Sequence, residues 1–459
     1  MDIKLRLTIL NFLQYFVWGA WLITMANFWF GTKHWDSTQF GAVFGTMGIA
    51  SIFMPTLAGI VADRWINAEK LYGVLQIAYA VTLFYLPHAE SPTVFFWLML
   101  LAMVFYMPTI ALSNSVNYHI LNDKGYDVVK VFPSLRVWGT IGFIVAMWIT
   151  NLTGNKATEG QFYIAGAVAV VLGLYAFTLP ASPPQKLIDK SASLAEQLGL
   201  NAFKLFGHYK MALFFMFSML LGAALQLTNA YGDVYLSEFA FYPKYAKSIF
   251  VEKSTIIMSI SQISETLFIL AIPFFLRKFG IKKVMLMSML AWVLRFGLFA
   301  YGNPGPGIWM IILSCIVYGM AFDFFNISGS LFVETTTDKK IRSSAQGLFM
   351  MMTNGFGAII GSYTAGWIID SFFTKKYDTA AALAQHLETT PQDASFIEIL
   401  KNEFHTSILP DGRLSALVEV KDWHHIWLTF ALYALVVAVL FAVMFKHKHH
   451  PKDVADFKH

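Results

Sequence analysis

Charged side chains are scarce in this sequence. Only 13% of its 459 residues are Asp, Glu, Lys or Arg, whereas 57% are hydrophobic, and the mean hydropathy is +0.56. A soluble domain carries about 25% charged residues, so a surface of this composition cannot face water everywhere. The scarcity of charge excludes an ordinary soluble protein and indicates a chain that is largely surrounded by lipid.

Cysteine and the signatures of catalysis are also missing or nearly so. The one cysteine, Cys315, lies in an apolar run, so no intrachain disulfide can form. We find no H-E-x-x-H, no G-x-S-x-G and no G-K-[ST] motif, which argues against an enzyme and predicts no metal site. The first residues, MDIKLRLTIL, lead directly into an apolar run without a small-residue cleavage site, so we expect no removable signal peptide.

Long apolar stretches recur along almost the whole chain. A helix needs roughly 20 apolar residues to cross a bilayer, and such stretches are expected to be helical because their backbone must be satisfied internally. Hydropathy gives about 12 of them. Their approximate limits are 6–30, 39–61, 71–87, 94–118, 132–151, 161–180, 210–236, 254–276, 281–301, 307–333, 343–372 and 425–446. The sequence therefore predicts an all-α membrane protein with about 12 transmembrane helices.

Two connections are much longer than the others. Residues 181–209 follow the sixth span and divide the chain into halves, and residues 374–423 separate the last two spans. Six spans, a long loop and six further spans are typical of transporters whose two pseudo-symmetric bundles rock about a central site. We expect bundles at 1–180 and 210–446, a linker whose middle lies as an amphipathic helix on the membrane surface, and a tail at 447–459.

Lysine and arginine are unevenly distributed over these connections. If the N-terminus is inside, the inside loops and tails carry most of them, and half of the outside set falls in the 374–423 loop, where the charge rule is weak. The bias predicts that both termini and the 181–209 linker are cytoplasmic, and that the 374–423 loop is an external, solvated cap with short helices. We interpret the net charge of +5 as a topology signal and not as a nucleic-acid footprint.

Four ionisable side chains lie well inside the expected spans, where burial is costly and a function is the default hypothesis. They are Arg136, Glu265, Arg295 and Asp323. Glu265 has no basic neighbour within one helical turn, and a buried carboxylate without a cation can carry a proton. Arg295 and Asp323 could instead form a structural ion pair, which is the interpretation we favour for Arg295.

Polar and aromatic residues share helix faces with these groups, because residues three, four or seven apart lie on one side of a helix. The faces are Arg136, Thr140 and Phe143; Gln226 and Asn229; Ser259, Gln262 and Glu265; and Tyr318, Phe322 and Phe325, with Asp323 and Asn326 beside them. Asp233 lies in the same span as Gln226 and Asn229, one turn further toward the outside, and other spans add Gln14, Trp18, Trp21, Asn114, Ser115 and Asn117. Amides, an arginine fork and aromatic rings suit a small, flat, polar ligand such as a nucleoside. The alternative for each residue is bonding or packing between helices.

A short motif follows the second span. Residues 59–64 read GIVADR and resemble the cytoplasmic G-x-x-x-D-R signature of the major facilitator superfamily. An Asp–Arg turn at a helix end can pair with the dipole and charges of a neighbouring helix and so hold one conformational state. We therefore expect Gly59, Asp63 and Arg64 to act as a gating latch. The alternative is an ordinary solvated turn.

Several segments extend this resemblance to one family within the superfamily. They are FLQYFVWGAWL, GIVADRW, LRVWGTIGF, FSMLLGAALQLTN, IIMSISQISETLFIL, IVYGMAFDFFNISGS and SAQGLFMMMTNGFG. They resemble the bacterial nucleoside:proton symporters, and the resemblance runs from the first span to the last. The 374–423 loop is the main departure, because we expect a shorter loop in that family. The resemblance implies the major facilitator fold of two six-helix bundles.

The resemblance also implies roles for individual residues. The substrate contacts of the family fall on Arg136, Thr140, Phe143, Gln226, Asn229, Gln262, Glu265, Tyr318 and Phe322. Asp323 lies beside them, and Glu265 or Asp323 would cycle the coupling proton. The resemblance implies no cofactor besides that proton.

The leading hypothesis is a proton-coupled symporter that imports nucleosides, such as uridine or adenosine, across the bacterial cytoplasmic (inner) membrane by alternating access. Its other partner is the lipid bilayer, and nothing in the sequence demands more than a monomer. Two alternatives are open at this point. One is a major facilitator exporter of drugs or other small metabolites, and the other, from a different class, is a polytopic membrane receptor or enzyme.

Overall fold

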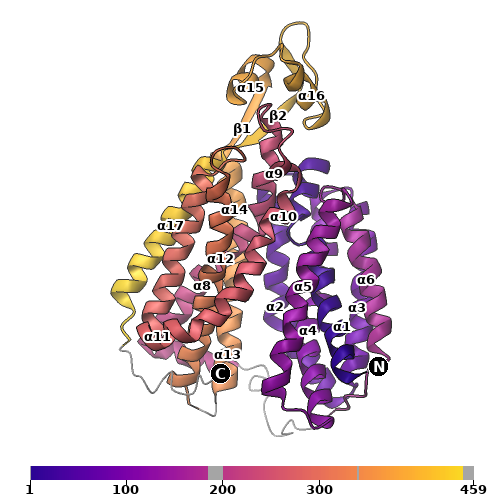
Figure 1. Cartoon of the computed structure of the whole chain (residues 1–459), viewed down its shortest axis with the longest axis vertical. Coiled ribbons are helices and arrows are strands. Elements are labelled where there is room, and N and C mark those ends of the chain that lie inside the picture. The colour runs from indigo at the N-terminus through magenta and orange to yellow at the C-terminus, as the bar shows by residue number, and fades with distance from the viewer. Residues whose placement is uncertain (1, 185–199, 339–340, 448–459) are drawn as a thin grey trace.

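The computed structural model describes residues 2–184, 200–338 and 341–447. Most of the described chain is helical, and the helices form two bundles that stand side by side (Figure 1). The expected surface helix in the middle of the 181–209 linker and nearly all of the 447–459 tail lie outside the described residues. The space between the two bundles is where the candidate site is found.

The N-terminal part of the chain forms the first bundle. Its elements are α1 (Ile3–Gly19), η1 (Asn27–Thr32), α2 (Ser37–Arg64), α3 (Ala68–Tyr85), η2 (Leu86–His88), α4 (Pro92–Asp123), α5 (Val128–Leu152) and α6 (Gly160–Ala176). Helix α1 packs mainly on α5, α2 on α4, and α3 on α6 and α4. These pairings bring α1, α2, α4 and α5 around one face of the bundle.

The remaining helices form the second bundle. They are η3 (Leu200–Gly207), α8 (Tyr209–Ser237), η4 (Glu238–Phe241), α9 (Ile249–Glu252), α10 (Ser254–Met258), α11 (Ile260–Tyr301), α12 (Ile308–Thr336), α13 (Arg342–Met350), η5 (Met351–Gly357), α14 (Ala358–Ile368), η6 (Ile369–Phe373) and α17 (Trp423–Met444). Helix α11 packs extensively on α12 and α17, and α8 packs on η5 and α14.

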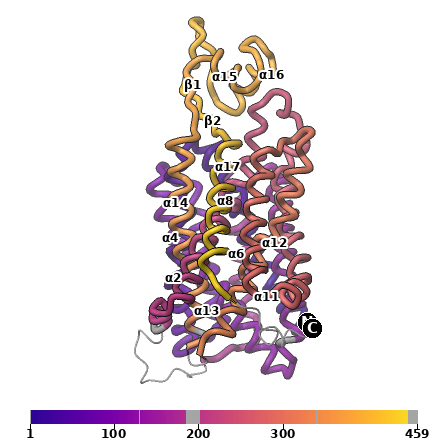
Figure 2. Tube along the Cα trace, turned by 90° about the vertical axis from the view of Figure 1, so that its left-hand side faces the viewer, coloured from indigo at the N-terminus to yellow at the C-terminus, as the bar shows by residue number. Residues whose placement is uncertain are grey.

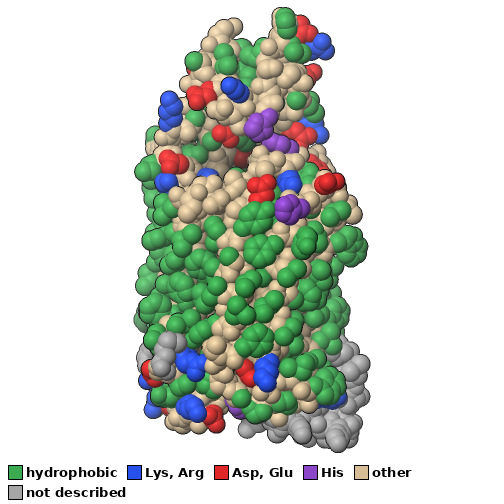
Figure 3. Space-filling view, turned by 90° about the vertical axis from the view of Figure 1, so that its right-hand side faces the viewer, with side chains coloured by type: hydrophobic (Ala, Val, Ile, Leu, Met, Phe, Trp, Pro, Cys, Tyr) green, Lys and Arg blue, Asp and Glu red, His purple; other side chains and the backbone are tan. Residues whose placement is uncertain are grey.

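The apolar segments counted in the sequence are all helical, but not all are continuous. Seven helices in the described part of the chain are long and apolar enough to cross a membrane. One of these runs joins the eighth and ninth spans across a kink at Gly280, whose φ of 76° suits glycine. The first span breaks at residues 20–24, and the eleventh is interrupted by the π-helical segments η5 and η6. Figure 3 shows the resulting band of hydrophobic side chains between two charged ends.

Residues 374–421 form a small domain on one end of the second bundle (Figures 1 and 2). Strands β1 (Thr374–Thr379) and β2 (Arg413–Lys421) pair antiparallel, and α15 (Ala380–His386) and α16 (Ala394–Asn402) lie between them in the chain. The domain has its own apolar core, which includes Leu383, Phe396 and Val418. The short helices were expected from the sequence, whereas the two strands were not.

The bundles meet at one end and separate toward the other. We call the end that carries β1 and β2 the hairpin side, and the end with the start of α1 the terminus side. A Cβ on Gly48 of α2 would lie 2.6 Å from the carbonyl oxygen of Gly355, so the two backbones touch there. A Cβ on Gly59, further along α2, would meet no atom within 4 Å. The structure is therefore closed on the hairpin side.

Candidate functional site

A cavity of about 780 Å³ lies between the two bundles. Its lining extends to Pro55 and Thr56 on α2 and to Ser344 and Gly347 on α13, toward the terminus-side ends of those helices. The volume is within the range of roughly 300–1,000 Å³ found for small-molecule sites. Since the bundles are in contact on the hairpin side, the cavity is accessible from the terminus side.

The nine residues that the family resemblance assigned to the substrate all line this cavity. They are Arg136, Thr140, Phe143, Gln226, Asn229, Gln262, Glu265, Tyr318 and Phe322. The first three come from α5 in the N-terminal bundle, and the others come from α8, α11 and α12 in the C-terminal bundle. A ligand in the cavity would therefore contact both bundles at once, which is the arrangement that alternating access requires.

Close packing of α1 on α5 positions the N-terminal wall. The guanidinium carbon of Arg136 lies 3.9 Å from the centroid of the Tyr15 ring. Gly139 makes this possible, because a Cβ there would lie 2.6 Å from the Tyr15 ring and 2.8 Å from Nη1 of Arg136. Trp18 meets Phe143 edge to face at 6.4 Å. The wall thus combines a fixed cation with three aromatic side chains, Tyr15, Trp18 and Phe143.

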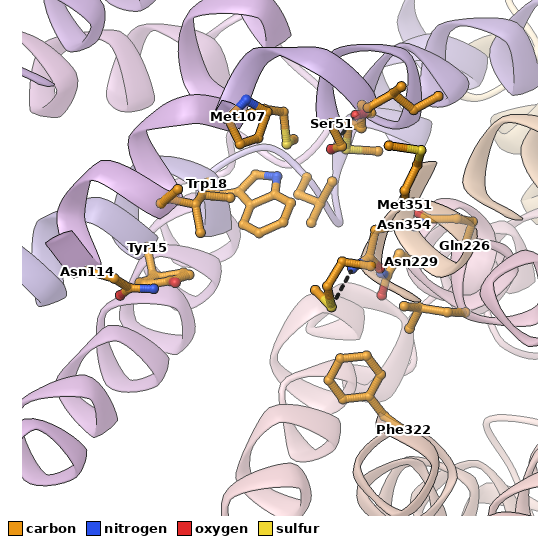
Figure 4. A pocket seen from close by; sticks show the side chains of 18 of the residues that line it. Tyr15, Trp18, Ser51, Met107, Asn114, Gln226, Asn229, Phe322, Met351 and Asn354 are labelled. Carbon is orange, nitrogen blue, oxygen red and sulfur yellow. Dashed lines mark hydrogen bonds between the residues drawn. The ribbon is translucent and has the colours of Figure 1, made fainter. Parts of the chain in front are cut away.

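The C-terminal wall combines stacked rings with amides. The rings of Tyr318 and Phe322 are 5.8 Å apart and nearly parallel, at 3°. Gly319 lets α12 approach α11, because a Cβ there would lie 2.6 Å from the carbonyl oxygen of Ser264. Figure 4 shows Gln226 and Asn229 together on one wall of the pocket, with Phe322 nearby. Neither amide has a hydrogen bond to another described residue.

Several polar atoms that face this region are buried without a partner. They include Nε1 of Trp18, Oδ1 of Asn114 and Oε1 of Gln262, all in residues that line the cavity. A buried polar atom without a hydrogen bond costs about 1–3 kcal/mol, so such atoms need an explanation. A polar ligand would supply the missing partners, since these side chains offer donors and acceptors on both walls.

The two carboxylates in the spans are placed differently. Glu265 lines the cavity, and the charge of Arg136 acts on it from the opposite bundle. Asp323 is only 4% exposed and does not line the cavity, and its Oδ2 has no partner. Neither carboxylate forms an ion pair with a described residue. Neither carboxylate is therefore held permanently ionised by a direct ion pair.

The prediction of an ion pair between Arg295 and Asp323 is wrong, because no such pair is present among the described residues. Nη1 of Arg295 donates to the carbonyl oxygen of Ser314 at 2.5 Å. Its guanidinium also lies 4.9 Å from the Phe299 ring and 4.7 Å from the Tyr318 ring. This cation is therefore positioned by two aromatic rings and by a backbone carbonyl of α12, and not by a carboxylate.

The expected latch residues lie at the terminus-side end of α2. Asp63 is exposed and forms no ion pair with a described residue. Because the bundles are apart at this end, the structure is in a state in which a latch there would be open. The latch function of Gly59, Asp63 and Arg64 stays a prediction.

Some cavity residues were missed or underrated in the sequence. Tyr15, Ser51 and Asn354 line the cavity, although no periodic pattern set them apart. Asn354 lies in the π-helical segment η5, and such segments are often found at functional sites. Gln14, Trp21 and Asn117, by contrast, bond within the N-terminal bundle. In the described residues, no group of three or more His, Cys, Asp or Glu is arranged to hold a metal ion.

The comparisons with known proteins agree with one another. A family model described as "Nucleoside H+ symporter" matches residues 1–386 and ends inside the hairpin-side domain. The chain is 46% identical to the xanthosine permease of Escherichia coli (strain K12), covering 99% of this chain and 98% of that protein. It is 44% identical to the nucleoside permease NupG of the same organism, covering 98% and 97%.

Solved structures give the same result for the fold. The crystal structure of the nucleoside transporter NupG superposes with a TM-score of 0.82 over 98% of this chain and all of that chain. A crystal structure of its D323A mutant gives 0.85 over 97% of this chain. The predicted fold class, a 12-helix membrane protein of the major facilitator type, is thereby confirmed.

Proposed function

This chain belongs to the nucleoside H+ symporter family, and we propose that it binds its nucleoside in the cavity between the two bundles. It is a multi-pass protein of the bacterial inner membrane. The observation that carries the proposal is the convergence of residues from both bundles on one cavity of about 780 Å³. The family resemblance implies these substrate contacts, and the geometry supports them, because the same residues come together around one cavity.

The chemistry of the walls supports a nucleoside as the ligand. The stacked Tyr318 and Phe322 and the edge of Trp18 offer aromatic surface to a base. The amides of Gln226, Asn229 and Gln262 offer donors and acceptors for the exocyclic groups of a base or the hydroxyls of a ribose. We expect uridine and adenosine to be substrates, with xanthosine as a further candidate because of the related xanthosine permease.

Glu265 and Asp323 are the proposed proton carriers. Glu265 shares the cavity with the substrate and faces Arg136, so its protonation changes the charge that the substrate and the opposite bundle meet. Asp323 acts on Glu265 electrostatically and has an oxygen without a partner. Two nearby carboxylates disfavour being ionised together. One proton shared by Glu265 and Asp323 would allow the carrier, empty or loaded, to change between its inward-open and outward-open states.

The proposed orientation puts the terminus side in the cytoplasm and the hairpin side outside. The bias of Lys and Arg toward the terminus-side loops supports it. In this orientation the structure is an inward-open state, and the 374–421 domain is external. Both termini are then cytoplasmic.

The test is uptake of labelled uridine, adenosine and xanthosine by cells without their own nucleoside carriers. We expect concentrative uptake that a protonophore abolishes. An excess of unlabelled nucleoside should compete with the label, whereas free bases and ribose should not. If free bases or sugars compete equally well, the cavity binds a different ligand from the one proposed.

Two further outcomes separate the alternative functions. Binding of nucleoside without accumulation in sealed vesicles would indicate a receptor and not a transporter. Accumulation that persists with a protonophore would refute proton coupling while leaving nucleoside transport intact. Cys315→Ser is a suitable matched control, because this buried residue does not line the cavity.

A further inference from the structure

The hydrogen bonds between the two bundles are concentrated on the hairpin side. Oγ1 of Thr38 donates to Asp370 at 3.0 Å, Nε1 of Trp148 donates to Ser259 at 2.8 Å, and Nδ2 of Asn151 donates to the carbonyl oxygen of Glu252 at 3.1 Å. These bonds must break if the carrier is to open toward the hairpin side. The strongest of these contacts is expected to control the opening.

Lys156 makes the most extensive of these links. It lies in the connection between α5 and α6, and its ammonium group reaches into the C-terminal bundle. Nζ donates to Oγ of Ser237 at 3.2 Å, to Oγ of Ser254 at 3.1 Å, and to the carbonyl oxygens of Val251 at 3.1 Å and Glu252 at 3.3 Å. The ammonium is thus surrounded by oxygens of the opposite bundle, much as a bound cation would be. Hydrogen bonds from a charged donor are stronger than neutral ones.

Asp233 supplies the opposite charge beside this oxygen cluster. It lies on α8, one turn beyond the cavity residue Asn229, and its side chain is 0% exposed. Oδ2 accepts hydrogen bonds from Nδ2 of Asn27 in the N-terminal bundle and from Oγ1 of Thr255 at 3.2 Å, while Oδ1 has no partner. Lys156 is the cation whose charge acts on Asp233, from beyond ion-pair distance, since the two side chains form no ion pair within 4.0 Å in the described part of the chain.

The surroundings of the pair contain few other charges. Glu252 and Lys253, between α9 and α10, form an ion pair with each other at 2.6 Å. Glu403, which follows α16, is the remaining charged group that acts on Lys156. Burial lowers the pKa of Lys156, and Asp233, Glu403 and Glu252 counteract that effect. The carboxylates of the opposite half therefore favour the charged form of the ammonium, against the effect of burial.

We propose that Lys156 and Asp233 form an external latch that holds the carrier closed to the outside, because each of them bonds to the opposite bundle. The latch opens when Asp233 takes up an external proton, which weakens its hydrogen bond from Asn27 and its attraction for Lys156. This rests on the proposed orientation. A protonated Asp233 no longer attracts the ammonium, so acid outside weakens the closed state and exposes the cavity to the outside. The latch would thus connect the direction of the proton gradient to the side on which the cavity opens.

Cross-linking across the hairpin side tests the latch without any transport measurement. In a Cys315→Ser background, cysteines at Thr38 and Asp370 place two thiols where the native side chains are in contact. A short bifunctional thiol reagent links them only while that side is closed. We expect Lys156→Met to lower the rate of linking by about tenfold. The reason is that the substitution removes a set of charge-assisted hydrogen bonds that stabilises only the state closed on the hairpin side. Lys156→Arg should lower it much less.

The pH dependence distinguishes a latch from a passive contact. With Asp233 present, linking should slow as the external pH falls, because protonation removes the charge that holds Lys156. Asp233→Asn mimics the protonated form, so its linking should be slow at every pH. Lys247→Met is the matched control and should behave like the parent, because this exposed hairpin-side lysine forms no hydrogen bond or ion pair with a described residue.

Two results would overturn the proposal. One is a Lys156→Met protein that remains folded, as shown by its melting temperature, and is linked as fast as the parent. The other is an Asp233→Asn protein that retains the full pH dependence. Because linking needs no nucleoside, either result leaves the proposed substrate and its cavity untouched, and a failure of nucleoside uptake leaves the latch untouched.

Discussion

The two bundles differ in how they hold the ionisable groups that lie in or next to the cavity. In the N-terminal bundle, Arg136 lies over the Tyr15 ring, and Glu69 accepts hydrogen bonds from the backbone N–H of Ser182 at 2.8 Å and from Asn67 at 3.1 Å. In the C-terminal bundle, Glu265 and Asp323 have no hydrogen-bond partner among the described residues. The N-terminal bundle therefore holds Arg136 in a fixed position, whereas the C-terminal bundle leaves Glu265 and Asp323 free to change protonation.

Two buried glutamines, Gln14 of the N-terminal bundle and Gln262 of the C-terminal bundle, differ in the same way. Oε1 of Gln14 accepts hydrogen bonds from Tyr72 at 2.5 Å and from Gln76 at 2.8 Å, and its Nε2 donates to Thr109 at 3.0 Å. Gln262, in the C-terminal bundle, keeps Oε1 without a partner and lines the cavity. A hydrogen-bond network such as that around Gln14 makes a protein interior more rigid. We infer that the N-terminal bundle is the fixed wall of the site and the C-terminal bundle is the wall that changes.

The largest expected effect comes from the carboxylate in the changing wall. Glu265→Gln keeps the shape of the side chain but can no longer release a proton. We expect concentrative uptake to fall by about 100-fold or more, because each coupled turnover needs that release. Exchange of labelled for unlabelled nucleoside, which needs no net proton movement, should persist. Equal loss of uptake and exchange would show that Glu265 only binds substrate.

The next effect concerns the fixed cation of the opposite wall. Arg136→Lys retains the charge but loses the planar fork and its stacking on Tyr15. We expect the KM for uridine to rise by about 10- to 100-fold, equivalent to the loss of roughly 1.4–2.8 kcal/mol of binding. The maximal rate should change much less. A changed maximal rate at constant KM would instead place Arg136 in the conformational step.

A matched pair of substitutions tests the division most directly. Gln14→Leu removes a bonded amide and should lower stability by about 1–3 kcal/mol, measured as a lower melting temperature in detergent, with a modest change in uptake. Gln262→Leu removes an amide with a free oxygen, so it should leave the melting temperature nearly unchanged and impair uptake. If both variants show the same pattern, the two bundles do not differ as described.

The smallest effect is expected at Arg295. Its guanidinium supports the Tyr318 ring from the side that does not face the cavity. Arg295→Met keeps the volume but removes a buried charge, so the stability should change by less than about 1–2 kcal/mol in either direction. We expect the KM for nucleoside to rise by roughly threefold, because a small loss of order in one ring costs less than 1 kcal/mol. An unchanged KM would limit Arg295 to packing.

Much of the site could be predicted before the structure. The faces that contain Arg136, Gln226, Glu265 and Tyr318 followed from helical spacing and from the cost of burying polar groups in lipid. Family resemblance then added the ligand. Tyr15 and Asn354 could not be found in this way, because an aromatic ring and an amide in a glycine-rich segment are common in helix packing. Only their position on the cavity distinguishes them.

The sequence by itself determined the membrane class, the two six-helix halves and the family. The reason is that hydropathy, the charge of the loops and the local motifs are properties of the chain that need no contact between distant residues. The tertiary structure decided which polar groups remain without partners. Arg295 contacts a carbonyl and two rings instead of Asp323, and Lys156 reaches Ser237 and Ser254 across the bundle interface. Helix packing, and not sequence distance, determines which side chains meet.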